Sequence, residues 1–130
     1  MMVMLDTNAL LWAAYAPGKL SAPAEQTYFE TQKIHVSMVS LWEIGLKMSR
    51  GGFHGFKVPV DWENSLWSWM TEQGFEIIGV ELADCRKIQD LPFHHNDPFD
   101  RMLIAQALRG KFSVIGIDEN FDAYGVRRIW

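Results

Sequence analysis

Short apolar stretches alternate along the chain with longer segments that have the periodicity of amphipathic helices. The apolar stretches predict strands at Met2–Leu5, Ile34–Ser37, Phe75–Val80, Ser113–Ile117 and, at the end of the chain, Arg127–Trp130. The periodic segments predict helices at Asn8–Tyr15, Ser21–Lys33, Met38–Met48, Asp61–Gln73, Glu81–Asp90 and Asp97–Arg109. Strands that alternate with helices in this way favour the α/β class, with a parallel sheet covered by helices on both faces.

Length and composition limit the class of protein. The 130 residues, 48% of them hydrophobic, suffice for one core and are too few for two, so we expect a single domain over residues 1–130. No apolar run approaches the roughly 18 to 20 residues of a membrane span, and the first residues lack a signal-peptide pattern. We therefore expect a cytoplasmic protein without membrane contact. Cys85 is the only cysteine, which excludes an intrachain disulfide and a thiolate zinc cluster.

The net charge of −4 argues against a protein that simply coats a polyanion, because such proteins carry a basic surface. Two interpretations stay open. Either nucleic acid is not the partner, or the acidic residues gather where a cation neutralises them. In the second case local basic surface would come from Lys47, Arg50, Lys57, Arg101, Arg109 and Lys111.

Two aspartates directly follow predicted strands. In an open parallel sheet, ligands bind beyond the carboxyl ends of the strands, and Asp6 and Asp118 occupy that position. Taken singly, each has a simpler interpretation as the residue that caps the next helix or turn.

Asp100 lies on the apolar side of its helix. It precedes Leu103 and Ile104 by three and four residues, and so extends the buried stripe toward the helix start. The alternative is a capping arrangement with Asp97. Asp97 itself is better explained as the N-cap of this helix, because Asp is preferred there and Pro98 suits the first helical position.

Glu43 lies in the middle of the predicted helix Met38–Met48. By itself it would be interpreted as an exposed residue paired with Lys47 at i,i+4. The combination of acids changes this interpretation, since carboxylates from four elements at one sheet edge repel each other unless a hard divalent cation lies between them. Ligands that are all oxygen favour magnesium or manganese over zinc. We therefore predict one metal site formed by Asp6, Glu43, Asp100 and Asp118.

Other sites of chemistry are weaker. His94 and His95 are adjacent, so one helical face cannot present both to a zinc ion, and a position on a loop surface is favoured. The chain has no Walker loop, no GxGxxG and no GxSxG. Asp6 could begin an aspartyl-phosphate site, but position 8 is Asn8 where such enzymes have a second aspartate.

Three segments resemble the signatures of the PIN-domain family and, within it, of the VapC-like toxins of bacterial toxin–antitoxin pairs. They are Met4–Trp12, Ser40–Ile44 and Leu91–Ala107, of which the last is specific. Position by position, Asp6, Glu43 and Asp100 match the three most regular acids of the family, and Asp118 matches the fourth. The chain departs from the pattern at Gly116, where the family usually has Thr or Ser, while Thr7 matches a family hydroxyl.

This resemblance implies a three-layer α/β/α domain, Mg²⁺ or Mn²⁺ at the acidic cluster, and endonucleolytic cleavage of RNA by a metal-activated water. Asp6 and Asp100 would be the main ligands, Glu43 and Asp118 would complete the shell or hold waters, and Arg101 would approach the substrate backbone. The resemblance also implies a cognate antitoxin that covers the crevice, and a homodimer. The six tryptophans exceed what one small core readily encloses, so we expect some to be exposed at a partner interface.

Two other functions stay open from the sequence. One is a deoxyribonuclease or 5′-nuclease that uses the same acidic site. The other is an interaction module that keeps the fold without catalysis, although the four intact acids argue against it.

Overall fold

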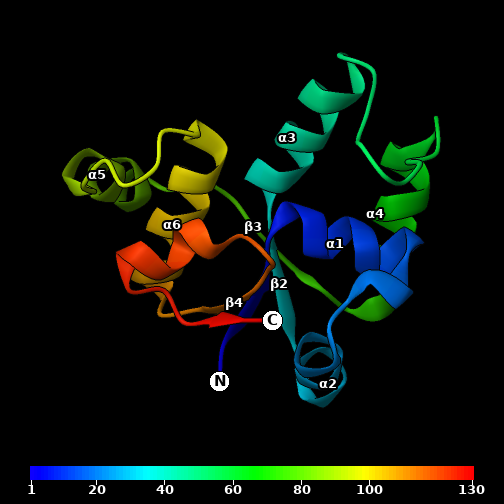
Figure 1. The fold of residues 1–130 in the computed structure, drawn as a ribbon, viewed down its shortest axis with the longest axis horizontal. Helices are drawn as coiled ribbons and strands as arrows, with labels where there is room; N and C mark the ends of the chain where they lie inside the picture. Colours follow the sequence, from blue (N-terminus) through cyan, green and yellow to red (C-terminus); the bar gives the residue numbers. More distant parts are fainter.

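Five parallel strands form the central sheet of the computed structural model, which describes all residues 1–130 (Figure 1). The strands are β1 Val3–Leu5, β2 Ile34–Ser37, β3 Glu76–Ile78, β4 Ser113–Ile115 and β5 Arg128–Ile129. Their order across the sheet is β3-β2-β1-β4-β5, and every neighbouring pair is parallel. The predicted parallel sheet is confirmed, although β3 and β4 are shorter than the sequence pattern indicated.

Helices cover both faces of this sheet, as the α/β class requires. They are α1 Thr7–Tyr15, α2 Ala22–Glu30, α3 Met38–Met48, α4 Trp62–Gln73, α5 Leu82–Asp90 and α6 Pro98–Gly110, with 3₁₀ turns η1 Pro17–Lys19 and η2 Glu119–Tyr124. Figure 1 shows α1, α2 and α4 on one side of the sheet and α5 and α6 on the other. None of the helices has the length and apolar character that a bilayer crossing requires.

Strand β1 joins the two halves of the core, because its side chains alternate between the faces of the sheet. Val3 and Leu5 pack in the cluster that α1 and α4 cover, whereas Met4 belongs to the cluster beneath α6. All three side chains are fully buried. Such burial on both sides explains why this strand reads as a continuous apolar run.

Helix α2 is shorter than predicted. It ends at Glu30 rather than near Lys33, because Thr31 leaves the helical conformation, with φ −88° and ψ 121°. The Thr31 amide and the Thr31 hydroxyl both donate to the Thr27 carbonyl oxygen, at 3.1 and 2.6 Å, and so close the last turn of the helix.

The strand order places a crevice beside β1. From β1 the chain moves to β2 and then β3 on one side, and later returns to β4 and β5 on the other. In open parallel sheets, ligands bind outside the carboxyl ends of the strands at the point where the order reverses. Here that point lies between the ends of β1 and β4, where the Asp6 amide donates to the Ile115 carbonyl oxygen at 3.1 Å.

Candidate metal centre

A small polar cavity lies at this edge of the sheet. Its volume is about 110 Å³, and no apolar residue lines it. The lining residues are Asp6, Thr7, Asn8, Glu43, Lys47, Asp97, Asp100 and Asp118. The structure therefore brings the four predicted acids together, from elements that are far apart in the sequence.

Asp6 lies where β1 turns into α1, and only 5% of its surface is exposed. One carboxylate oxygen, Oδ1, accepts a hydrogen bond from the Ala9 amide at 2.8 Å and so caps α1. The capping interpretation is confirmed, and the cap uses only one of the two carboxylate oxygens.

Burial raises the pKa of Asp6 to about 7. The hydrogen bond from Ala9 opposes this shift, and the charges of Asp100, Glu43 and Asp118 add to it. The charges of the other three acids thus act on Asp6 across the cavity.

Glu43 is held by two neighbours. Thr7 Oγ1 donates to Glu43 Oε1 at 2.6 Å and lies 3.0 Å from Ser40 Oγ, and Lys47 Nζ lies 3.0 Å from Glu43 Oε2. The pairing with Lys47 is confirmed, but the interpretation of Glu43 as an exposed residue is wrong, since only 5% of it is exposed. Helix α3 follows β2 without a connecting residue, so its second turn carries Glu43 over the sheet edge.

Asp100 bonds to a histidine that the sequence pattern placed on a loop surface. His95 Nε2 lies 2.8 Å from Asp100 Oδ2, and the His95 side chain is 22% exposed. The capping alternative for Asp100 is wrong for its side chain. Only its backbone amide takes part, donating to Asp97 Oδ1 at 3.0 Å, so Asp97 is the N-cap of α6 as predicted.

Burial raises the pKa of Asp100 to about 6. The hydrogen bond with His95 opposes the shift, whereas the charges of Asp97, Glu43 and Asp118 favour it. Asp6, which is buried, and Asp100, which is partly buried, therefore both have a raised pKa and carboxylate neighbours.

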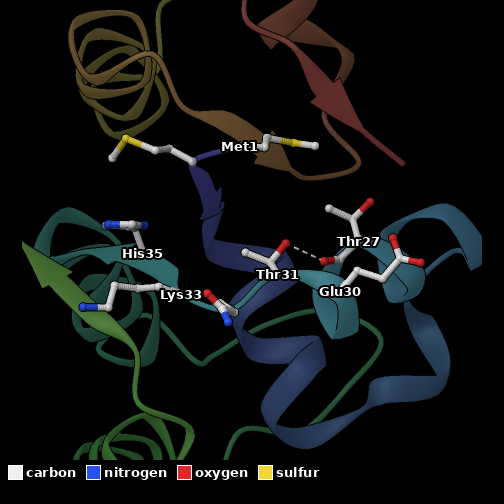
Figure 2. Close-up of a pocket in the computed structure, with 8 residues that line it drawn as sticks. Met1, Thr27, Glu30, Thr31, Lys33 and His35 are labelled. Atoms are coloured by element: carbon white, nitrogen blue, oxygen red, sulfur yellow. Dashed lines mark hydrogen bonds between the residues drawn. The ribbon is translucent and has the colours of Figure 1, made fainter.

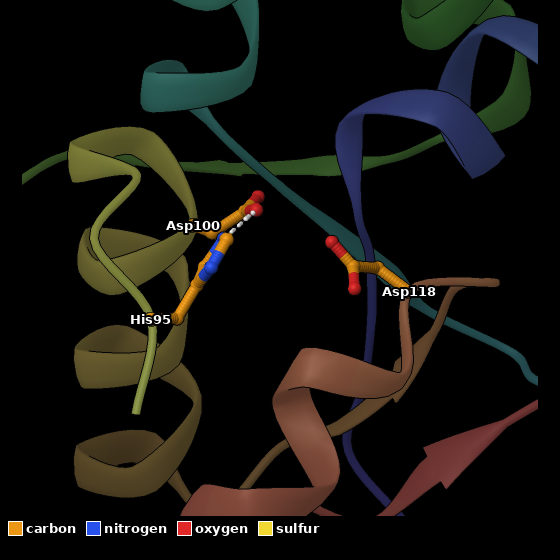
Figure 3. Close-up of side chains that lie close together, drawn as sticks. All are labelled: His95, Asp100 and Asp118. Carbon is orange, nitrogen blue, oxygen red and sulfur yellow. Dashed lines mark hydrogen bonds and ion pairs between the residues drawn. The ribbon is translucent and has the colours of Figure 1, made fainter. Parts of the chain in front are cut away.

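Asp118 approaches from the opposite side of the cavity. It follows β4 and caps η2, with Oδ1 accepting from the Asn120 amide at 2.9 Å. Figure 3 shows Asp118 pointing toward the hydrogen-bonded pair of Asp100 and His95. One ligand atom from each of these three residues lies within 4.8 Å of the other two.

The departure from the family pattern at Gly116 has a structural reason. A Cβ atom at this position would overlap Asp6 Oδ2 and lie 2.6 Å from Asp6 Cγ, closer than packed atoms approach. The carboxylate of Asp6 thus uses the space that a larger residue's side chain would need.

The cavity fits a divalent cation. Its donors are carboxylate oxygens, the ligands that hard cations prefer, and Lys47 is the only basic residue among those that line it. Carboxylates that lie close together are stabilised in their charged form when a cation lies between them.

Arg101 does not face this cavity. Only 6% of it is exposed, and its guanidinium donates to the carbonyl oxygens of Pro92 at 2.8 Å and of Leu91 and His95 at 3.2 Å. The expectation that Arg101 approaches a substrate backbone is therefore wrong. Its guanidinium instead fixes the loop before α6. The position of Arg101 next to Asp100 in the sequence does not show this role.

A larger hollow of about 670 Å³ lies near the amino-terminal ends of the strands (Figure 2). Its charged or titratable lining residues are Glu30, Lys33 and His35. His35 Nδ1 already lies 3.2 Å from the Val3 carbonyl oxygen. This hollow is a weaker candidate than the smaller cavity, because it gathers no set of converging ligand groups and lies away from the carboxyl ends of the strands.

Solved structures with the same fold include three protein complexes. VapBC2 from Rickettsia felis, bound to a DNA fragment from its promoter, has a TM-score of 0.73 and 14% identity, with all of both chains covered. DNA-bound VapBC from Salmonella typhimurium has a TM-score of 0.70 and 15% identity, over 98% of this chain and 96% of that one. A toxin–antitoxin complex from Klebsiella pneumoniae has a TM-score of 0.58 and 14% identity, over 90% and 87%.

No curated protein sequence matches the chain. The family model of the PIN domain, in contrast, matches residues 3–126, which include the strands β1 to β4 and all the acids of the cavity. The chain belongs to the PIN-domain family.

Proposed function

We propose that the protein is a magnesium- or manganese-dependent endoribonuclease that hydrolyses RNA phosphodiester bonds, and that it is the toxin of a toxin–antitoxin pair. The observation that carries the nuclease proposal is the burial of Asp6 in one cavity with Glu43, Asp100 and Asp118. Such like charges are stable together when a divalent cation binds between them.

Asp6 and Asp100 would hold the cation most directly, as the family resemblance implies, whereas the Glu43 carboxylate is already held by Thr7 and Lys47. Glu43 and Asp118 would complete the shell or hold metal-bound waters. When bound, a divalent cation lowers the pKa of a coordinated water and neutralises charge on the phosphate. Thr7 orients Glu43 through its hydrogen bond of 2.6 Å.

Lys47 would contact the substrate. It lines the cavity and is 43% exposed at its side chain, so its ammonium can leave Glu43 and meet a phosphate oxygen. The positive charge of Lys47 beside the acids also reduces the repulsion that the negatively charged cavity exerts on RNA. Lys47 thus takes the role expected from the sequence for Arg101.

The antitoxin proposal rests on the family and on a second surface. The related Klebsiella pneumoniae structure is a toxin–antitoxin complex. In this chain, a hollow of about 200 Å³ lies among α1, α2 and α4 and is lined mostly by apolar residues, including Leu20, Phe29 and Trp69. Phe29 is exposed, as an anchor for a partner helix would be.

The homodimer expected from the VapC resemblance also has a candidate surface. Trp42 is 67% exposed, which confirms the prediction that some tryptophans lie at the surface, and its ring packs against Phe99 at 4.9 Å. Exposed aromatic residues are enriched in interfaces between proteins. Light scattering on the wild type and the Trp42→Ser variant would test this surface.

One experiment separates the nuclease functions from the silent interaction module. The purified full-length chain is incubated with labelled RNA and labelled DNA, each with magnesium and with a chelator. Cleavage of RNA alone, only with metal, supports the proposal. Cleavage of DNA alone favours the deoxyribonuclease alternative, and the absence of cleavage of either favours the interaction module.

A further inference from the structure

We propose that His95 is a metal ligand. With Asp100 and Asp118 it would form a mixed nitrogen and oxygen site on one side of the acidic cavity, and this site would favour Mn²⁺ and other transition-metal ions over Mg²⁺. The inference rests on the proposed divalent-metal centre and adds a ligand and a metal preference to it.

The distances among the three groups suit a single ion. A first-row divalent ion with ligand distances of roughly 2.0–2.2 Å holds adjacent ligands roughly 3 Å apart and opposite ligands roughly 4.3 Å apart. His95 Nε2 and Asp100 Oδ2 are 2.8 Å apart, the separation of adjacent ligands. The three ligand atoms lie within 4.8 Å of one another, so only a small closing movement of Asp118 is needed.

The backbone of His95 is fixed before any ligand arrives. Its amide donates to the Tyr124 hydroxyl at 2.9 Å, and its carbonyl oxygen accepts from Arg101 Nη1 at 3.2 Å. Arg101 also lies within 3.2 Å of the Tyr124 hydroxyl. A buried arginine and a tyrosine from η2 therefore hold the loop so that the imidazole faces Asp100, which lowers the ordering cost of ligation.

Imidazole nitrogen changes the metal preference of an otherwise acidic site. Mg²⁺ prefers oxygen ligands and keeps several waters, whereas transition-metal ions accept imidazole and carboxylate together. His95 would ligate as the neutral tautomer that carries its proton on Nδ1, so that Nε2 no longer donates to Asp100 and binds the ion through its lone pair. Both Asp100 and His95 would then contact the same ion.

A positioning role for His95 is the competing explanation, because its hydrogen bond alone would orient Asp100. The two roles differ in what they predict. If Asp100 loses its orientation, the protein binds every ion that uses Asp100 more weakly. If a nitrogen ligand is lost, the binding of transition-metal ions is weakened selectively. The His95→Gln variant separates them, since the glutamine amide can still donate to Asp100 but removes the imidazole nitrogen.

The test uses tag-free, full-length wild type, His95→Gln and a matched control, His94→Gln. The control histidine is exposed, and its ring packs on Tyr124 at a centroid distance of 5.1 Å. Calorimetry measures the binding of Mn²⁺ and of Mg²⁺ to each protein. Pulsed electron paramagnetic resonance of bound Mn²⁺ detects a directly coordinated imidazole nitrogen, and circular dichroism confirms that each variant is folded.

We expect the nitrogen signal in the wild type and in His94→Gln, and its loss in His95→Gln. Mn²⁺ affinity should fall by about tenfold or more in His95→Gln, while Mg²⁺ affinity changes by less than about threefold. Equal losses of Mn²⁺ and Mg²⁺ affinity in His95→Gln would overturn the ligand role of His95. A wild-type spectrum without nitrogen coupling would overturn it too. If the wild type binds neither ion, the metal centre itself is wrong, whereas Mg²⁺-dependent RNA cleavage without a nitrogen signal would overturn His95 alone.

Discussion

The carboxylate of Asp6 occupies the space where a side chain at position 116 would begin, and residue 116 is a glycine. The glycine directly follows β4, and a Cβ atom there would overlap Asp6 Oδ2. The two residues come from neighbouring strands, since Asp6 follows β1 and β1 pairs with β4. The absence of a side chain at 116 therefore determines where one of the proposed metal ligands can lie.

The Gly116→Ala variant should lose metal binding more than stability. Overpacking typically costs about 1–3 kcal/mol, but a ligand displaced by roughly 1 Å lowers activity by about 100-fold. Calorimetry with Mn²⁺ and an RNA cleavage assay would measure both. Gly79→Ala serves as the control, because a Cβ atom there meets nothing within 4 Å. Wild-type affinity in Gly116→Ala would show that Asp6 does not need this space.

The Asp6→Asn and Asp100→Asn variants should abolish metal-dependent RNA cleavage and remain folded. Each change removes a carboxylate ligand but also relieves repulsion among the acids. In Asp6→Asn the side-chain amide oxygen can still accept the hydrogen bond from Ala9, so the cap of α1 is kept. Melting temperatures without metal should stay level or rise. Asp61→Asn, at an exposed residue, is the matched control. Cleavage at the wild-type rate in either variant would refute the site assignment.

Without metal, stability should fall as the pH rises from about 4 to 7. The pKa of Asp6 is about 7 in the folded chain against 3.8 ordinarily, so in this range the folded state binds a proton that the unfolded state has released. The free energy of unfolding then decreases with pH and levels off above about 7. Urea denaturation at several pH values would measure the slope. The Asp6→Asn variant should show a smaller slope, and an unchanged one would mean that another group is responsible.

Magnesium or manganese should raise the melting temperature of the wild type. An ion that binds only the folded state, at about 100 times its dissociation constant, adds about 2.7 kcal/mol to the free energy of unfolding. The double variant Asp6→Asn, Asp100→Asn should respond much less. Thermal denaturation with metal and with a chelator measures this effect. Equal shifts in both proteins would place the ion elsewhere.

Expression of the chain alone in a bacterial host should arrest growth. Co-expression with the gene beside it should restore growth and give a complex that co-purifies. The Phe29→Ser variant, altered in the apolar hollow among α1, α2 and α4, should remain toxic but be rescued less well. Harmless expression of a folded protein that cleaves RNA would contradict the toxin role and leave the nuclease role intact.

Much of the fold could be predicted from local patterns. The apolar runs ending at Leu5 and Ser37 are strands, and Asp97 caps the helix that Pro98 opens. These features depend on residues near one another in the chain, where hydrophobic periodicity and capping preferences act directly. The placement of Asp6 just beyond β1 was foreseeable for the same reason, although its role as a ligand stays a prediction.

The order of the strands and the neighbours of each acid were decided only by the tertiary structure. His95 and Arg101 are close in the sequence, yet the His95 side chain bonds to Asp100, whereas Arg101 is buried among carbonyl oxygens. The helical pattern around Glu43 indicated an exposed residue, but Thr7 lies beside it because α1 and α3 meet at the sheet edge. Sequence spacing specifies which side of an element a residue occupies. What that side faces depends on how distant elements pack, and here that packing encloses the acids in one cavity.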